Sequence, residues 1–137
     1  MGLQARVLQA STAAEIDSAF ATLDREPSNI LFVEGDPFFT SRRVQLAILA
    51  AQHSIPSTYA TREIVEAGGL MSYGANIPEG WRQAGAYVGR ILKGEKPAEL
   101  PVMQSSNFEL VVNAQTARTF GLAVPHSLIA IADEVIQ

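Results

Sequence analysis

Few residues of this 137-residue sequence have the types and spacing that catalysis requires. Cysteine is absent, which excludes thiolate nucleophiles, thiolate metal sites and disulfides. The two histidines, His53 and His126, have no second histidine or carboxylate at metal-binding spacing. No phosphate-binding loop, GxSxG, HExxH or dinucleotide glycine motif occurs. The sequence therefore predicts a protein that is not an enzyme and holds neither a metal ion nor a cofactor.

Glu34 and Asp36 are the carboxylates best placed to form an acid and base pair. They follow the apolar run at 30–33, which is typical of a strand covered on both faces. No lysine, histidine or set of metal ligands accompanies them. A small α/β enzyme that uses Glu34 and Asp36 therefore stays an alternative interpretation.

The ends of three predicted strands carry residues suited to a small polar organic ligand. In an open α/β sheet, ligands bind beyond the carboxyl ends of the strands. Asp36 could accept a hydrogen bond from an ammonium group while aromatic rings cover apolar parts of the ligand. Asp36 could equally cap the following turn, with Phe38 and Phe39 in the core. The candidate ligand-binding residues are Asp36, Pro37, Phe38, Tyr59, Arg62, Ser72, Tyr73 and Gly74.

The elements that would position these residues form an α/β domain with a doubly wound, mainly parallel sheet flanked by helices. Strands are expected at 6–9, 30–33, 57–60, 70–73 and 108–112. Helices are expected at 12–25, 41–53, 61–67, 78–93 and 114–120, with a final helix from 125 that includes Val135. Right-handed crossovers are expected to place the early helices on alternate faces of the sheet. Thr12 and Glu15 predict a capping box, and Asn113 predicts a helix cap.

Composition excludes several other classes of function. The net charge is −4, the pI is near 5.1 and the basic residues are scattered, which argues against binding to nucleic acid. The 47% hydrophobic and 18% charged residues are typical of a globular domain. No apolar run approaches the roughly 20 residues that span a bilayer. The first residues show no export signal.

Several motifs resemble the ABC-type solute-binding proteins of the TrpX-like group. The motifs are GDPFFTSRR at 35–43, REIVEAGGLMSYG at 62–74, ILKG at 91–94, FELVVN at 108–113 and ADEVI at 132–136. The resemblance implies the type I periplasmic-binding-protein fold and a role as solute-binding component of an ABC importer. It implies a small organic ligand such as an amino acid, bound in a cleft between two lobes. It also implies a membrane permease as partner and, for the full-length family, a periplasmic or extracytoplasmic lipoprotein.

The resemblance covers only the C-terminal portion of such a protein. We therefore expect a fragment: a truncated chain, one whose start lies inside a longer reading frame, or the product of a degenerate gene. By resemblance, Asp36, Pro37 and Phe38 line the cleft wall of the second lobe. A single lobe is expected to bind a solute weakly or not at all, because it offers one wall of a two-walled site.

The helix within 77–94 would belong to the absent N-terminal lobe. Its apolar stripe consists of Trp81, Ala84, Val88, Ile91 and Leu92. Without that lobe the stripe would be left in water, so the helix is expected either to fold back onto its own sheet or to pack against a second copy, and we favour the homodimer. An alternative is the ligand-sensing domain of a regulator, which shares this fold; that interpretation needs a DNA-binding segment, and the sequence contains none.

Overall fold

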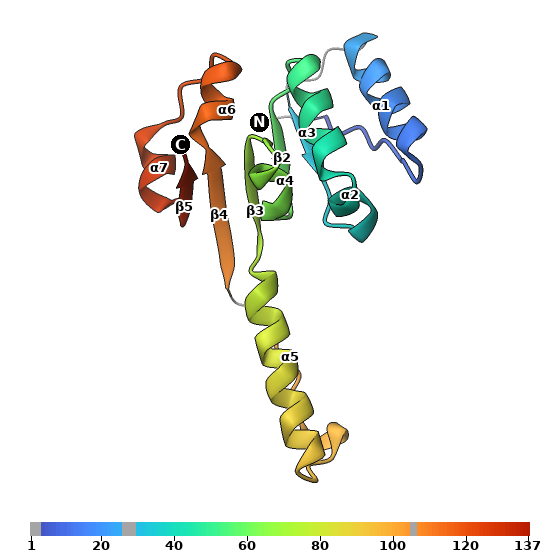
Figure 1. Cartoon of the computed structure of the whole chain (residues 1–137), viewed down its shortest axis with the longest axis vertical. Helices are drawn as coiled ribbons and strands as arrows, with labels where there is room; N and C mark the ends of the chain where they lie inside the picture. Colours follow the sequence, from blue (N-terminus) through green and yellow to red (C-terminus); the bar gives the residue numbers. More distant parts are fainter. Residues whose placement is uncertain (1–3, 26–29, 105–106) are drawn as a thin grey trace.

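The computed structural model describes residues 4–25, 30–104 and 107–137. Its elements are α1 (Ala13–Arg25), β1 (Leu31–Val33), α2 (Pro37–Ser41), α3 (Arg43–Gln52), β2 (Ser57–Tyr59), α4 (Arg62–Glu66), β3 (Met71–Ala75), α5 (Ile77–Leu92), the 3-10 helix η1 (Pro97–Glu99), β4 (Phe108–Asn113), α6 (Ala114–Thr119), α7 (His126–Ile131) and β5 (Glu134–Ile136). Figure 1 shows two parts, a lobe that holds the five strands and an arm made of α5 and the segment that returns from it.

The sheet has the strand order β1-β2-β3-β4-β5. All neighbouring pairs are parallel except β3 and β4, which run antiparallel. The antiparallel pair follows from the arm, because the chain leaves the sheet after β3 and re-enters it from the same edge as β4 (Figure 1). The predicted α/β class with a mainly parallel sheet flanked by helices is confirmed.

One face of the sheet carries the main hydrophobic core. The helices α1, α3 and α4 contribute to a single cluster with side chains of β1, β2 and β4. The buried members of this cluster are Ile16, Phe20, Leu23, Val33, Leu46, Ala50, Ile55, Tyr59, Ile64, Val65 and Val111. The prediction of helices on alternate faces is therefore wrong for this part of the chain. Successive right-handed crossovers that move in one direction across a sheet keep their helices on one face, and β1, β2 and β3 follow one another in that way.

The opposite face of the sheet is only partly covered. Leu110 and Val112 of β4 are buried on the face opposite to Val111, because neighbours along a strand point to opposite faces. Phe32 of β1 and Tyr73 of β3 remain exposed. The sheet is thus packed on both faces near β4 and on one face near β1.

Two predicted elements are absent at their expected places. Residues 6–9 form no strand, because no neighbouring strand pairs with them within the described sheet. The final helix ends at Ile131, and Val135 instead lies in β5, where it pairs with Val112 of β4. A short amphipathic run fits the period of a helix and that of a strand equally well. Here the run became a strand because it could pair with the free edge of β4.

The predicted caps account for several helix starts. Thr12 Oγ1 accepts a hydrogen bond from Glu15 N at 3.3 Å and Glu15 Oε2 accepts one from Thr12 N at 3.2 Å, which confirms the capping box. Asn113 Oδ1 accepts from Thr116 N at 2.9 Å and caps α6. The helix expected at 41–53 is found as α3, and a short helix that was not predicted, α2, precedes it, because Asp36 and Pro37 begin a helix there.

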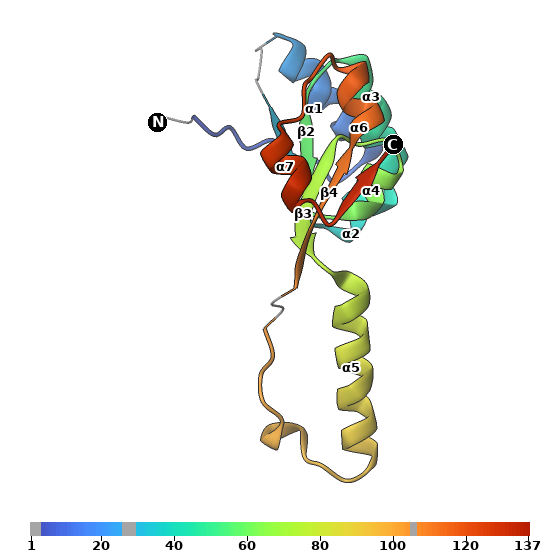
Figure 2. The same cartoon turned by 90° about the vertical axis from the view of Figure 1, so that its left-hand side faces the viewer.

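Helix α5 leaves the lobe at the carboxyl end of β3 and extends away from it, as Figures 1 and 2 show. None of its residues is buried. The returning segment runs beside the helix, and Tyr87 Oη donates a 2.6 Å hydrogen bond to the carbonyl oxygen of Pro101. The arm therefore holds itself together but has little contact with the lobe beyond its base.

Candidate ligand-binding site

The carboxyl edge of the parallel strands gathers polar residues from all five strands. The chain leaves β1, β2 and β3 at this edge, and it enters β4 and β5 there because those two strands run in the opposite direction. Glu34 and Asp36 lie at the β1 end of the edge, whereas Glu109 and Glu134 lie at the β4 and β5 end. The predicted positions of Asp36 and Tyr73 on one rim agree with this topology.

A groove of about 410 Å³ lies at the β1 end of the rim. Asp36 Oδ1 accepts a 2.7 Å hydrogen bond from Phe38 N and so caps α2, while its side chain stays exposed. Pro37 occupies the first turn of that helix. Phe38 is partly buried, packs on the core cluster and contacts the Phe39 ring at 5.4 Å. The lining residues are Ala10, Ser11, Glu34, Gly35, Asp36, Phe38 and Phe39.

The structure confirms that Asp36 caps the following turn, whereas its contact with a ligand stays a prediction. The carboxylate is a helix cap and at the same time lines an open groove. Ser11 and Glu34 join it there, and Ser11 was missed as a site residue. The sequence feature that could have indicated Ser11 is its position just before the capping box. There Ser11 N and Oγ donate to Glu15 Oε2, and these bonds hold the segment that lines the groove.

Arg62 lies on the rim, but its guanidinium is engaged by three carboxylates. Nε donates to Glu66 at 2.8 Å, Nη1 to Glu109 at 3.0 Å and Nη2 to Glu134 at 2.5 Å. The hydrogen bonds to Glu66 and Glu134, followed by the charge of Glu109, raise the pKa of Arg62 above its ordinary value. In this structure Arg62 joins α4, β4 and β5. Its guanidinium is bound to carboxylates of the chain itself, and the predicted contact with a solute stays a prediction.

Tyr59 and Ser72 lie inside the lobe and do not reach the rim surface. They pair across β2 and β3, and their exposed fractions are 0% and 1%. Burial raises the pKa of the Tyr59 phenol, which keeps the side chain neutral. Their side chains point to the face that α4 covers, away from the rim surface, and their contact with a ligand stays a prediction.

Tyr73 and Gly74 stand at the end of β3, where the chain turns toward the arm. Tyr73 is exposed, and its ring stacks on Phe108 with centroids 5.7 Å apart and planes at 21°. A Cβ at Gly74 would lie 1.9 Å from the carbonyl oxygen of Ala60. Glycine is therefore required here for the close approach of two backbones, whatever role it has toward a ligand.

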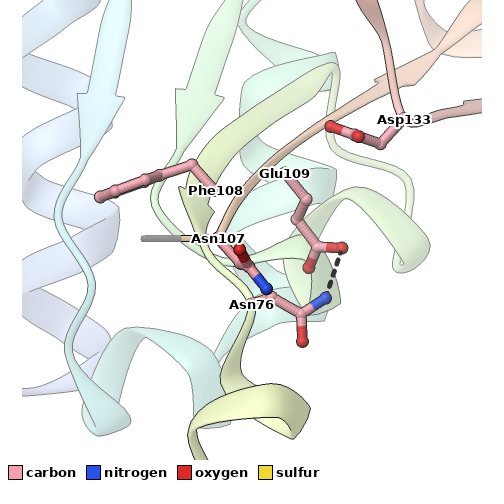
Figure 3. Close-up of a pocket in the computed structure, with 5 residues that line it drawn as sticks. All are labelled: Asn76, Asn107, Phe108, Glu109 and Asp133. Carbon is pink, nitrogen blue, oxygen red and sulfur yellow. Dashed lines mark hydrogen bonds between the residues drawn. The ribbon is translucent and has the colours of Figure 1, made fainter. Parts of the chain in front are cut away.

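A second groove, of about 420 Å³, lies at the foot of β4, as the close-up in Figure 3 shows. Its lining residues are Asn76, Asn107, Phe108, Glu109 and Asp133. Asn76 Nδ2 donates to Glu109 Oε2 at 3.2 Å, and Asp133 Oδ2 accepts from Leu110 N at 2.8 Å. Sequence reasoning missed this groove, because it depends on the antiparallel return of β4, which brings Asn76 close to residues that lie far from it along the chain.

Neither a metal-binding cluster nor a membrane-spanning helix is found in the described ranges 4–25, 30–104 and 107–137. No group of three or more histidine, cysteine or carboxylate side chains there could hold a metal ion. None of the helices in those ranges has both the length and the hydropathy needed to cross a membrane.

The family of this chain follows from comparison with known proteins. The family model described as ABC transporter substrate binding protein matches residues 1–136. The chain belongs to this family. Its members, like the structural neighbours, are substrate-binding proteins and not enzymes, which agrees with the prediction from the missing catalytic motifs.

Solved structures support the same assignment. A conserved domain protein from Vibrio cholerae has a TM-score of 0.80 at 26% identity, over 89% of this chain and 41% of that one. The ABC domain from Streptococcus pneumoniae, in complex with L-Trp, has a TM-score of 0.82 at 26% identity, over 90% and 41%. A ligand-free, open substrate binding protein with adhesive properties from Clostridium difficile shares the fold, with a TM-score of 0.65 at 23% identity over 93% and 42%. No curated protein matches the chain. The chain thus spans about two fifths of the length of the solved structures that it matches.

Proposed function

We propose that this chain forms one wall of a solute-binding site in the substrate-binding protein of an ABC importer. The observation that carries the proposal is the groove at the carboxyl end of β1, lined by Asp36 and Phe38 on a family member's lobe. Substrate-binding proteins of ABC transporters work outside the cytoplasmic membrane and deliver a small molecule to a permease, which is the partner we propose here.

The ligand class we propose is a small organic solute with an ammonium group, such as an amino acid. Glu34 and Asp36 place two carboxylates on one groove, the described residues that line it include no basic side chain, and Phe38 and Phe39 supply apolar surface. Carboxylates and aromatic rings together suit a ligand that is cationic at one end and apolar at the other. The complex of the related S. pneumoniae domain with L-Trp is in keeping with such a ligand. Asp36, Pro37, Phe38, Tyr73 and Gly74 remain the proposed contacts, with Arg62 as an organiser of the rim.

The test is a titration of the chain with L-tryptophan and with N-acetyl-L-tryptophan, followed by NMR shifts of backbone amides. We expect weak binding of the free amino acid, centred on the β1 groove, and a smaller response to the acetylated form. Asp36→Asn keeps an oxygen that can cap α2 but removes the charge, so it should weaken binding without unfolding the lobe. Glu99→Gln, on the exposed η1, is the matched control. Shifts centred elsewhere, or micromolar affinity of the single chain, would contradict the proposal.

We also propose that the arm is a docking surface. In the longer proteins of the family, α5 would pack on the other lobe, and in this chain alone a second copy would take that place. The chain exposes 9372 Å². A compact monomer of 14.7 kDa exposes roughly 7,000 Å². The excess is larger than the ~800 Å² that each partner buries in an ordinary interface.

The dimer is tested by light scattering at ~100 μM, where an interface worth about −8 kcal/mol is mostly formed. We expect a homodimer in which Trp81 fluorescence is shifted to shorter wavelength. Val88→Asp places a charge on the apolar stripe and should give a monomer. Ala86→Asp puts the same charge on the opposite side of α5 and should leave the dimer intact. A monomer at this concentration, or equal effects of the two variants, would refute the proposal.

A further inference from the structure

We propose that Asn76 and Glu109 form a junction lock that sets the direction in which α5 leaves the lobe. The proposal concerns the angle between lobe and arm and does not depend on which solute binds. Figures 1 and 2 show α5 connected to the lobe at its first residues only. Because no residue of α5 is buried, packing along its length does not determine that angle.

Asn76 connects the helix to the sheet through three separate hydrogen bonds. Its Oδ1 accepts from Glu79 N at 2.9 Å and so caps α5. Its Nδ2 donates to Glu109 Oε2 at 3.2 Å, as drawn in Figure 3. Its backbone N donates to the carbonyl oxygen of Asn107 at 2.9 Å. The side chain and backbone of Asn76 thus hold the first turn of α5 next to the start of β4.

Glu109 is in turn fixed by the lobe. The same oxygen, Oε2, accepts from Arg62 Nη1 at 3.0 Å, and the Glu109 side chain is only 13% exposed. Arg62 is itself held by Glu66 on α4 and Glu134 on β5. The chain of contacts therefore runs from α4 and β5 through Arg62 and Glu109 to Asn76 and α5, and each bond to Arg62 is a charge-assisted hydrogen bond.

The arrangement separates two roles that single substitutions can distinguish. Asn76→Asp keeps a cap acceptor for α5 but removes the Nδ2 donor, and it places a carboxylate next to Glu109. Glu109→Ala removes the acceptor shared by Asn76 and Arg62. Glu134→Ala also takes one carboxylate from Arg62, but Glu134 has no bond to Asn76, so it is the matched control.

The experiment measures the distance between the lobe and the arm with two spin labels. The sequence has no cysteine, so Gln52→Cys on α3 and Ala86→Cys on α5 take the labels at those positions alone. Labelled chains are diluted with unlabelled chains, so that only distances within one chain are read. We expect a single narrow distance peak for the parent and for Glu134→Ala. We expect loss of that peak in Asn76→Asp and in Glu109→Ala.

Conservative replacement provides a further test. Glu109→Gln retains an oxygen that can accept from Asn76, so it should recover a narrower distribution than Glu109→Ala. If Glu109→Ala unfolds the lobe, as judged by circular dichroism, then Asn76→Asp and Glu109→Gln decide the question. A parent-like peak in Asn76→Asp, or a broadening in Glu134→Ala as large as in Glu109→Ala, would overturn the proposal.

Discussion

Helices α1 and α5 carry similar apolar stripes, but the stripe of α1 is buried and that of α5 is exposed. Ile16, Phe20 and Leu23 of α1 are exposed by 2%, 2% and 8%, because they pack on α3 and the sheet. Trp81 and Val88 of α5 are exposed by 73% and 55%. Both helices begin with a cap and keep the same spacing of apolar side chains.

The difference shows what an apolar stripe does and does not encode. Its spacing predicts that a segment is helical, since only a helix brings these positions to one face. It does not predict where the covering surface is located. For α1 that surface is the sheet of the same lobe, whereas none of the described residues buries the stripe of α5, which is why the dimer and the second lobe are the proposals to test.

The largest contrast is expected from matched truncations of isoleucine in lobe and arm. Ile64 of α4 is 1% exposed, and Ile64→Ala should lower the free energy of unfolding by about 2–5 kcal/mol through lost burial and a cavity. Ile91 of α5 is 38% exposed, and Ile91→Ala should change it by no more than about 0.5 kcal/mol. Urea unfolding of the monomeric chain measures both. Equal losses would mean that the arm belongs to the cooperative unit of the lobe.

Matched glycine substitutions test the same contrast, because replacement by alanine should destabilise the lobe but stabilise the arm. Gly74→Ala brings a Cβ against the backbone of Ala60, and it should destabilise the lobe by about 1–3 kcal/mol as β2 and β3 are forced apart. Gly85 of α5 faces open space, so Gly85→Ala should stabilise the helix by roughly 1 kcal/mol. Thermal unfolding reports the first effect and amide hydrogen exchange within α5 reports the second. Faster exchange in Gly85→Ala would indicate an unrecognised contact at that position.

The smallest contrast concerns pH and the first turns of the two helices. The hydrogen bonds from Arg82 and then Gln83 lower the pKa of Glu79 from 4.5 to about 2, and those from Ser11 lower the pKa of Glu15. A carboxyl group whose pKa is lower in the folded state stabilises it above the unfolded value near 4.5. That contribution is lost as the pH falls through about 2.

We therefore expect the helical signal of α5 to decrease between pH 4.5 and 2, and Glu79→Gln to remove this part of the pH dependence. NMR titration of the carboxyl groups gives both pKa values directly. Glu99→Gln should leave the titration of Glu79 unchanged, since Glu99 lies on η1 near Lys96. An ordinary pKa for Glu79 would show that its pair with Arg82 does not form in solution.

Part of the candidate site was predictable, because it depends on local order along the chain. Asp36, Pro37 and Phe38 follow a buried strand, and a parallel sheet puts such residues on its carboxyl edge. Arg62 was placed on the rim correctly, but its partners were not foreseen. Glu109 and Glu134 are 47 and 72 positions away and reach Arg62 only through strand order and direction.

Tyr59 and Ser72 illustrate the limit for side chains within strands. Alternation along a strand says that neighbours point to opposite faces, but not which face the helices cover. That choice was made by α1, α3 and α4, which all pack on the face of Tyr59 and Ser72. The predicted strand at 6–9 had a suitable apolar pattern, yet a strand needs a hydrogen-bonded neighbour, and none is present in the described sheet.

The sequence by itself determined most of the helices, several of their caps, most of the strands and the family, since these depend on side-chain period, on residues within a few positions of each other and on motifs. Only the tertiary structure decided the strand order, the face that carries the main core, the ion pairs of Arg62 and the projection of α5 away from the lobe. Those features depend on contacts between residues far apart in the chain. Such contacts form only where the packed elements bring the side chains within reach of one another.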